Sequence, residues 1–275
     1  LGPARVRLHG GSVYDEFERR WGAGAKVLAG EVVCASGAVV TPATVLPAGA
    51  HVFFYRELPD EVEVPFDIPV LYRDDDIVVV DKPHFLATMP RGRHVAQTAL
   101  VRLRRSLRLP ELSPAHRLDR LTAGVLLFTV RREVRGAYQS LFARGQVHKT
   151  YHAVAQGVPT VELPVTVRNR IVKRRGVLQA VVEPGEPNAE TLVESLGGER
   201  YRLTPRTGRT HQLRVHMCGL GVPICGDPLY PDVIDVAPED FSSPLQLVAY
   251  SLEFEDPLTG QPRRFVSERE LPGVE

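Results

Sequence analysis

The sequence predicts an α+β protein in which a mixed, mostly antiparallel sheet with flanking helices follows a small N-terminal unit. Short apolar runs rich in β-branched residues recur along the chain and are separated by Gly and Pro turns, which is typical of strands joined in hairpins. A few segments between them space their apolar residues as helices do. With 275 residues, 43% of them hydrophobic, the chain can bury the core of one large domain with a small appendage.

The first 58 residues predict a small unit of their own. A short helix over residues 14–21 should precede short strands within "GEVVCASGAVV" and "AGAHVFFY". The acidic, proline-punctuated segment 59–68 has no clear periodicity and predicts a linker. The large domain is then expected over residues 69–275.

The first half of the large domain alternates strands and helices. "PVLYRDDDIVVVDKP" predicts strands over 70–72 and 77–80 around an acidic turn, and apolar spacing over 95–107 predicts a helix with a basic face. The continuous apolar run "GVLLFTV" is typical of a strand covered on both sides. A helix over "RREVRGAYQSLFARG" should end at Gly145, because glycine tolerates the left-handed conformation found there.

The second half predicts hairpins around one more helix. "HKTYHAVAQG" reads as a strand, and the pair Gly197-Gly198 predicts a hairpin turn because such turns need positive φ. "TGRTHQLRVHMCGLG" favours a helix capped by Thr210. A last hairpin should turn through residues 256–260.

Several classes of chemistry lack their motifs. The sequence contains no GxxxxGK[ST], GxSxG or HExxH pattern. The nearest metal-like set is His211, His216, Cys218 and Cys225, but helical positions five apart are rotated by about 140° at roughly 100° per residue, so the two histidines would not converge. Adjacent carboxylates such as those of residues 74–76 also rarely converge in a turn. We therefore expect no metal site.

Charge and cysteine content suggest a partner and a compartment. The net charge is +1, but residues 101–135 hold nine Lys/Arg against three Asp/Glu, and residues 167–176 hold five basic residues and no acid. Such clusters suit a phosphate backbone, although a solvated surface explains either one equally well. No run reaches the roughly 18 to 20 apolar residues of a membrane span, and three cysteines argue against a disulfide framework. We expect a cytoplasmic protein without membrane contact.

The stretch "PAHRLDRLTAG" holds the most informative carboxylate. Asp119 lies between Arg117 and Arg120 just before the buried strand. A carboxylate beside guanidinium groups stays ionised, which makes it a poor proton donor but an available nucleophile. The residues alone leave two interpretations open. Asp119 neutralises its arginines in a structural ion pair, or it attacks an anomeric carbon as in a glycosidase, for which no second carboxyl partner is evident.

Four motifs carry a resemblance to a known family. "HRLDRLTAG" resembles the catalytic loop HRLDxxTSG of the RluA-type pseudouridine synthases, with Ala123 where the family more often has Ser. "LYRDDDIVVVDKP", "HKTYHAV" and "LTPRTGRTHQLRVHMCGLGVPICGDPLY" resemble the same family in the same order, over about residues 69–266. The segment before the linker is similar to the latter part of a small RNA-binding module, with its first helical portion shortened.

The resemblance implies the pseudouridine synthase catalytic fold and the isomerisation of a uridine within RNA without metal or cofactor. Asp119 would be the nucleophile that attacks the ribose anomeric carbon or carbon 6 of the uracil, and Arg209 would pair with it. Tyr151 would stack on the target base and help to remove the proton from carbon 5, and Arg117 would fill the gap left by the flipped uridine. The further residues expected to bind substrate are His116, Thr122 and His211.

The expected partner is a structured RNA. Ribosomal RNA is favoured, transfer RNA is the second choice, and a monomer is expected. Two rival functions remain from the sequence. One is a non-catalytic RNA-binding protein that keeps the synthase fold, and the other is a hydrolase of nucleosides or glycosides, which the extended basic segments disfavour.

Overall fold

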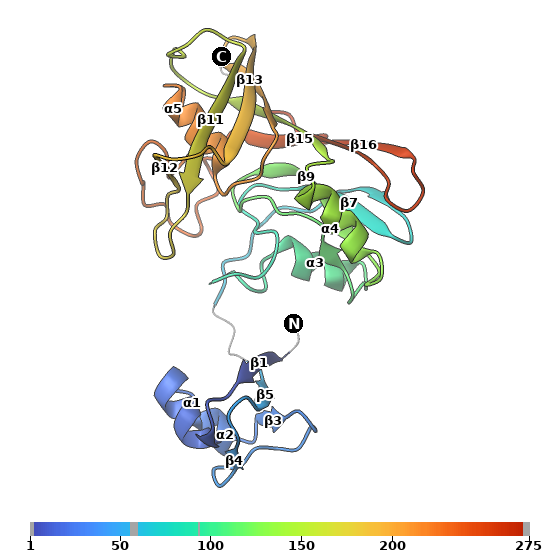
Figure 1. Ribbon diagram of the computed structural model, residues 1–275, viewed down its shortest axis with the longest axis vertical. Coiled ribbons are helices and arrows are strands. Elements are labelled where there is room, and N and C mark those ends of the chain that lie inside the picture. The colour runs from blue at the N-terminus through green and yellow to red at the C-terminus, as the bar shows by residue number, and fades with distance from the viewer. Residues whose placement is uncertain (1–2, 56–59, 93, 272–275) are drawn as a thin grey trace. The chain divides into compact units, whose positions relative to one another are not determined.

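The computed structural model describes residues 3–55, 60–92 and 94–271, and its contacts divide the chain into two units, Leu1–Asp60 and Glu61–Glu275 (Figure 1). The first unit has a three-stranded antiparallel sheet in the order β1-β5-β3 and a two-stranded sheet of β2 and β4. Its core includes the buried side chains of Val13, Phe17 and Val52. In chain order, its elements are β1 (Ala4–Arg7), β2 (Gly11–Ser12), α1 (Val13–Trp21), α2 (Gly24–Leu28), β3 (Val32–Cys34), β4 (Val45–Leu46) and β5 (His51–Phe54).

The structure describes residues 60–68 of the segment predicted as a linker. Residue 59 lies outside the described residues, and from Glu61 onward the chain belongs to the second unit. The Glu61 carboxylate accepts hydrogen bonds from the backbone N–H groups of Val95, Ala96 and Gln97 at 3.0, 2.6 and 2.9 Å. Val64 is buried in the core of the second unit. At least one acidic residue of this segment, Glu61, therefore satisfies backbone N–H donors of the second unit.

The second unit is built on an eleven-stranded sheet, in the order β12-β11-β13-β14-β10-β15-β9-β7-β6, with β16 beside β15 and β8 beside β9 (Figure 1). β15 and β9 run parallel, and the other strand pairs recorded for this sheet are antiparallel. The predicted α+β class with a mixed, mostly antiparallel sheet is thereby confirmed. None of the described helices is long and apolar enough to cross a membrane.

The elements of this unit follow in chain order. They are β6 (Val70–Arg73), β7 (Ile77–Lys82), α3 (Ala99–Ser106), β8 (Ser113–Pro114), β9 (Ala123–Thr129), α4 (Arg135–Ala143), β10 (His148–Val154), β11 (Val165–Val172), β12 (Val181–Glu183), β13 (Ala189–Gly197), β14 (Arg200–Pro205), α5 (Gln212–Gly219), β15 (Leu247–Glu255) and β16 (Pro262–Val266). The strands and hairpins expected from the sequence are all present, with shifts of a few residues at their ends.

The central strands are buried on both faces, which explains their unbroken apolar sequences. Val78 and Val80 of β7 face one core, to which α3 and α5 contribute, while Ile77 and Val79 face a second core that α4 covers. β9 alternates in the same way, and all seven of its residues are buried. A strand with both faces covered has no position for a polar side chain, so "GVLLFTV" shows no alternation.

Two helix starts differ from the sequence expectation. α5 begins after His211 rather than at Thr210, and His211 adopts a left-handed backbone with φ of 60° without a capping hydrogen bond from its side chain. α3 begins at Ala99, because the Thr98 hydroxyl caps it by accepting a hydrogen bond from the N–H of Val101 at 3.3 Å. Each boundary depends on a local hydrogen bond or dihedral angle that apolar spacing does not report.

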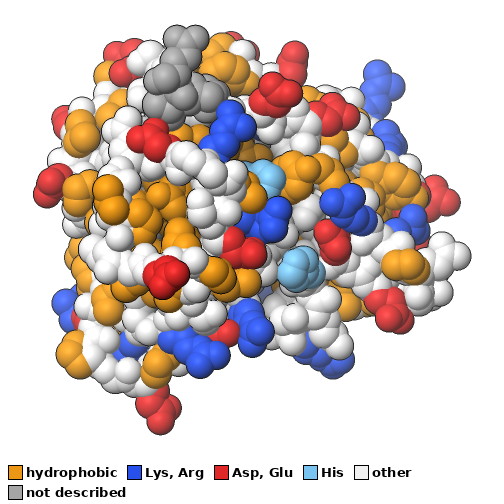
Figure 2. All heavy atoms as spheres, turned by 90° about the horizontal axis from the view of Figure 1, so that it is seen from above, with side chains coloured by type: hydrophobic (Ala, Val, Ile, Leu, Met, Phe, Trp, Pro, Cys, Tyr) orange, Lys and Arg blue, Asp and Glu red, His pale blue; other side chains and the backbone are white. Residues whose placement is uncertain are grey.

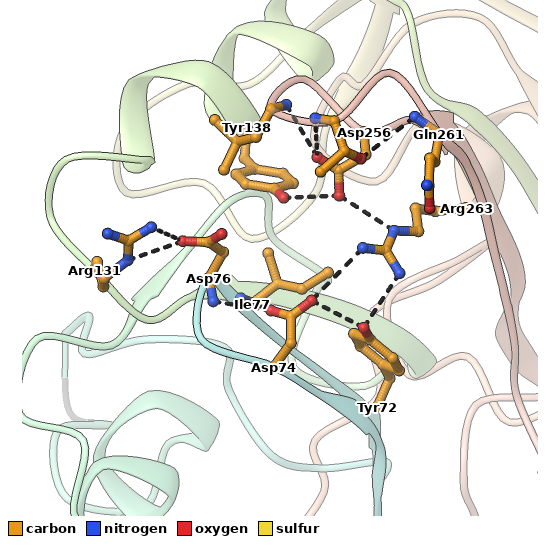
Figure 3. A network of polar contacts seen from close by, with 11 residues as sticks. Tyr72, Asp74, Asp76, Ile77, Arg131, Tyr138, Asp256, Gln261 and Arg263 are labelled. Carbon is orange, nitrogen blue, oxygen red and sulfur yellow. Dashed lines mark hydrogen bonds and ion pairs between the residues drawn. The ribbon is translucent and has the colours of Figure 1, made fainter.

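Two of the three adjacent aspartates of the β6–β7 turn, Asp74 and Asp76, have structural partners (Figure 3). Asp74 accepts hydrogen bonds from the N–H groups of Asp76 and Ile77 at 2.9 and 2.8 Å and from the hydroxyl of Tyr72 at 2.9 Å. Asp76 pairs with Arg131. The turn therefore uses its carboxylates to satisfy backbone donors and to bind the start of the segment leading to α4.

A buried carboxylate joins this turn to the β15–β16 hairpin (Figure 3). Asp256 accepts hydrogen bonds from the Tyr138 hydroxyl of α4 at 3.1 Å and from Nε of Arg263 at 3.2 Å. Arg263 also lies 3.7 Å from Asp74. Three segments distant in sequence, the β6–β7 turn, α4 and the last hairpin, are thus held together at one end of the sheet.

Candidate active site

The loop between β8 and β9 presents Asp119, and its backbone is anchored on both sides of that residue. The Thr88 hydroxyl donates to the carbonyl of Leu118 at 2.8 Å and accepts from its N–H at 3.1 Å. The N–H of Thr122 donates to the carbonyl of Asp119 at 3.1 Å and closes a tight turn. The half-buried Asp119 side chain is therefore carried by a fixed backbone.

A buried lysine holds the same loop through hydrogen bonds to backbone carbonyls. Lys82, the last residue of β7, is 0% exposed and donates from Nζ to the carbonyls of Pro83 and Leu86 at 2.8 Å each and of Arg120 at 3.3 Å. An ammonium group has three donors, so all of them are used. Burial lowers the pKa of Lys82 well below its usual range, while Asp119 opposes this shift. The hydrogen bond to Arg120 ties the residue after Asp119 to the central sheet.

Gly124 lets the loop enter the sheet at its parallel strand pair. β9 meets β15 in parallel with Gly124 opposite Ala249. The φ of Gly124 is 109°, and a Cβ atom there would lie 2.3 Å from the Ala249 carbonyl oxygen. No side chain fits at that distance, so a glycine is needed for β9 to pass β15 directly after the Asp119 turn.

Tyr151 enters the site from β10. The pairing of β10 with β15 shifts register between Thr150 and Tyr151, and such a bulge re-aims the side chains that follow it. Tyr151 is half-buried and packs against the larger core. Burial raises the pKa of its hydroxyl and the charge of Asp119 raises it further, so the hydroxyl stays protonated at neutral pH.

The loop between β14 and α5 is held by a buried glutamine. Gln212 accepts hydrogen bonds at Oε1 from the Thr207 hydroxyl at 2.7 Å and the Arg209 N–H at 3.0 Å. Its Nε2 donates to the Glu190 carbonyl and the Thr191 hydroxyl at 2.9 Å each. With every donor and lone-pair direction of the amide occupied, the loop that carries Arg209 is locked onto β13.

Arg209 itself does not make its expected contact. Its exposed side chain donates from Nε to the carbonyl of Asn188 at 3.0 Å. Within the described ranges, no ion pair joins it to Asp119. Arg209 and Asp119 line the same cavity, and the expected pairing between them stays a prediction.

His211 contacts a buried tyrosine. Its Nδ1 lies 2.9 Å from the hydroxyl of Tyr230, and that hydroxyl also lies 3.0 Å from the carbonyl oxygen of Ala180. The contact with Tyr230 fixes the position of the imidazole ring. Burial lowers the pKa of His211, although Asp119 opposes the shift.

His116, which was expected to bind substrate, makes two contacts within the protein. Its ring stacks on Phe142 of α4 with a centroid distance of 4.3 Å and an interplanar angle of 16°. Its Nε2 accepts a hydrogen bond from the N–H of Leu127 at 3.2 Å. Burial lowers the pKa of His116 to about 3, and the charge of Lys149 contributes to this. The imidazole is therefore neutral and connects α4 to β9.

One cavity of about 640 Å³ gathers the residues singled out by sequence. Three separate chain segments supply them: the β8–β9 loop, β10 and the β14–α5 loop. Thr122 is buried at 4% exposure, while Arg117 is exposed. The predicted residues that line the cavity are His116, Arg117, Asp119, Thr122, Tyr151, Arg209 and His211. The sequence analysis missed Lys149, Phe142 and Arg206, of which Lys149 could have been noticed because it lies two residues before Tyr151.

The basic residues do not form one continuous patch on the face seen in Figure 2, where they are mixed with acidic and hydrophobic side chains. Part of the basic segment 167–176 is neutralised locally, since Arg168 pairs with Glu190 at 2.8 Å and Arg174 pairs with Glu183. In the part of the chain that the structure describes, no three His, Cys, Asp or Glu side chains gather as metal ligands.

Comparison with known proteins gives a consistent result. The family model described as RNA pseudouridylate synthase matches residues 76–218. The human pseudouridylate synthase RPUSD2 is 37% identical over 171 residues, which cover 60% of this chain but only 31% of that protein. The dual-specificity RNA pseudouridine synthase RluA of Salmonella typhi is 34% identical over 208 residues, which cover 71% of this chain and 90% of that enzyme.

The fold agrees with the sequence comparison. The solved structure of human RNA pseudouridylate synthase domain containing 1 superposes with a TM-score of 0.59 at 26% identity, covering 77% of this chain and 86% of that chain. The family model itself spans more than half of the present chain. The chain therefore belongs to the RNA pseudouridylate synthase family, and its relatives include RluA.

Proposed function

We propose that the protein isomerises specific uridines of a structured RNA, with ribosomal RNA as the favoured substrate and Asp119 as the nucleophile. The observation that supports this most is the convergence of Asp119, Tyr151 and Arg209 on one cavity from three separate segments. Asp119 lies on an anchored loop, and anchoring is what a nucleophile needs in order to be held in attack geometry.

The proposed reaction rearranges bonds without a cofactor. The Asp119 carboxylate attacks the ribose anomeric carbon or carbon 6 of the uracil, and the bond between the anomeric carbon and N1 breaks. The uracil turns, carbon 5 bonds to the anomeric carbon, and the bond between Asp119 and the ribose or uracil breaks, which returns the free carboxylate. The proton on carbon 5 then leaves, and N1 gains a proton. Substrate and product are isomers, so no oxidant, reductant or second substrate is required.

Tyr151 and Arg117 have complementary proposed roles. The Tyr151 ring would stack on the flipped uracil. Because its hydroxyl stays protonated, Tyr151 suits stacking and hydrogen-bond donation better than removal of the carbon 5 proton. Arg117 is exposed at the cavity, where a planar guanidinium can replace the departed base in the RNA stack.

Arg209 requires a change of partner to act as proposed. Its Nε would exchange the Asn188 carbonyl for the Asp119 carboxylate once the cavity holds a nucleotide. Such an exchange would aim the carboxylate without moving the loop that Gln212 fixes. Arg209→Lys should therefore lower kcat more than it raises KM, because a lysine cannot reproduce the geometry of a guanidinium.

Tritium release tests the function directly. RNA carrying 5-tritiated uridine loses its label when carbon 5 is joined to the ribose, so unmodified ribosomal and transfer RNA transcripts can be compared side by side. We expect release from ribosomal transcripts by the wild type and none by Asp119→Asn, which keeps the shape of the side chain. Retained thermal stability and RNA affinity of the variant complete the control. Appreciable release by Asp119→Asn would overturn the assignment of the nucleophile.

A non-catalytic RNA-binding protein with the synthase fold is the second candidate. The observation in its favour is that, among the described residues, Asp119 and Arg209 do not form an ion pair. Salt-sensitive RNA binding without tritium release from either transcript would favour this alternative. Release from transfer RNA alone would keep the reaction and change the substrate.

A further inference from the structure

Lys149 is a cationic residue of the cavity to which the proposed reaction gives no role. It lies near the start of β10, two residues before Tyr151, and its half-buried side chain lines the same cavity as Asp119. Its Nζ donates to the carbonyl of Thr207 at 3.4 Å, close to the limit of a hydrogen bond. Lys149 therefore contacts the β14–α5 loop.

The charge of Lys149 has no carboxylate partner among the residues that the structure describes. Burial is the cause that lowers its pKa. Asp119, by contrast, acts on Tyr151 and His211. The charge of Lys149 instead helps to lower the pKa of His116.

The cavity is lined by Asp119, whose charge acts on Tyr151 and His211, and by Lys149, which contacts the carbonyl of Thr207. A half-buried ammonium without a counter-ion costs free energy in the empty protein, and a bound anion offsets that cost. Uracil and ribose carry no charge, whereas every nucleotide in RNA contributes a permanent phosphate charge.

We propose that Lys149 binds the backbone phosphate next to the target uridine, while Asp119 and Tyr151 take its ribose and base. This inference rests on the proposed function, because it assumes that the cavity accepts a nucleotide of an RNA chain. Lys149 is then a positioning residue that sets how far the nucleotide enters the cavity. A contact to the uracil oxygens is the competing role, and it would act on the chemical step rather than on binding.

The salt dependence of binding separates these roles. Binding of the ribosomal and transfer RNA transcripts is measured over a range of salt concentrations in the Asp119→Asn background, where no turnover occurs. If Lys149 neutralises a phosphate, Lys149→Met should make the plot of log K against log salt shallower by about 0.7 to 0.9. Lys149→Arg should restore the slope, because the charge is kept. Arg264→Gln is the matched control, since Arg264 is exposed, pairs with Glu253 and does not line the cavity.

Kinetics and stability add two independent readouts. In otherwise wild-type protein, Lys149→Met should raise KM for tritium release about tenfold, as expected for one lost charge-assisted hydrogen bond, with a smaller effect on kcat. Its thermal midpoint without RNA should equal or exceed that of the wild type, because an uncompensated half-buried charge is removed. A clear fall in that midpoint would mean that Lys149 is a structural support of Thr207, which would overturn the proposal.

A chemical substitution in the RNA completes the test. Neutral methylphosphonates placed singly on the 5′ and 3′ sides of the target uridine should weaken wild-type binding, and at one of the two positions Lys149→Met should show no further loss. Independent losses at both positions, or an unchanged salt slope, would overturn the phosphate contact. Absence of tritium release by the wild type would refute the proposed function, whereas the salt slope would still decide whether Lys149 neutralises a phosphate.

Discussion

Replacing Asp227 with Asn should destabilise the second unit strongly, because it removes the partner of a buried cation. The Arg214 side chain of α5 is 2% exposed and the Asp227 side chain 1% exposed. The guanidinium donates from Nε to one carboxylate oxygen at 2.8 Å and from Nη2 to the other, which is bidentate pairing. Asp227→Asn leaves the guanidinium buried without a counter-charge.

The magnitude follows from burial. Removing one partner of a buried pair costs about 3 to 5 kcal/mol. For a unit of this size each kcal/mol lowers the thermal midpoint by about 2 to 4 °C, so the loss should be roughly 6 to 20 °C. Differential scanning calorimetry and urea titration of the full chain measure it. Glu253→Gln, which breaks the exposed pair with Arg264, should cost less than about 1 kcal/mol.

A compensating variant separates charge from packing. Arg214→Met combined with Asp227→Leu removes both charges, so much of the lost stability should return. Recovery should be incomplete, because Asp227 also accepts hydrogen bonds from the N–H groups of Leu229 and Tyr230 at 2.8 and 3.2 Å. A free energy of unfolding for Asp227→Asn within about 1 kcal/mol of wild type would refute the view that the buried Arg214 depends on the charge of Asp227.

Three further perturbations test the fold around the site. Gly124→Ala should lower the thermal midpoint sharply, since its Cβ would lie 2.3 Å from the Ala249 carbonyl oxygen at a φ of 109°. Burial lowers the pKa of His216 to about 4, so the unfolded chain binds a proton that the folded protein does not as pH falls from about 6.5 toward 4. Stability should fall over that range, and His216→Gln should flatten the slope by at most about 1.4 kcal/mol per pH unit. Tyr138→Phe should cost about 1 to 2 kcal/mol in urea unfolding, through the lost hydrogen bond to Asp256, with tritium release retained.

Each of these has a control or a contradicting result. Gly136 lies in α4, and no neighbouring atom comes within 4 Å of the place that an added Cβ would take. Gly136→Ala should therefore stabilise the protein by up to about 1 kcal/mol, whereas Gly124→Ala should destabilise it. A pH slope that is the same with and without His216 would show that its burial does not depress protonation. A wild-type midpoint for Tyr138→Phe would mean that Arg263 and the backbone donors satisfy Asp256 without it.

The sequence indicated candidate site residues where they lie within short, contiguous motifs. The loop "HRLDRLTAG" singled out Asp119, and "HKTYHAV" and "TGRTHQ" singled out Tyr151 and Arg209, which line one cavity. The continuous apolar runs of β7 and β9 revealed strands covered on both faces, because such strands leave no position for a polar residue. These features depend on residues close together in the chain.

The sequence therefore determined the fold class, the family resemblance and which residues gather at the site, since each is encoded in periodicity or in a contiguous motif. Only the tertiary structure decided what the side chains contact. Arg209 donates to the carbonyl of Asn188, and His116 stacks on Phe142. Lys149, which the sequence did not single out, has no carboxylate partner among the described residues. The physical reason is that hydrogen bonds and ion pairs are satisfied by whichever groups lie within about 3 Å in space, and those groups come from segments tens of residues apart.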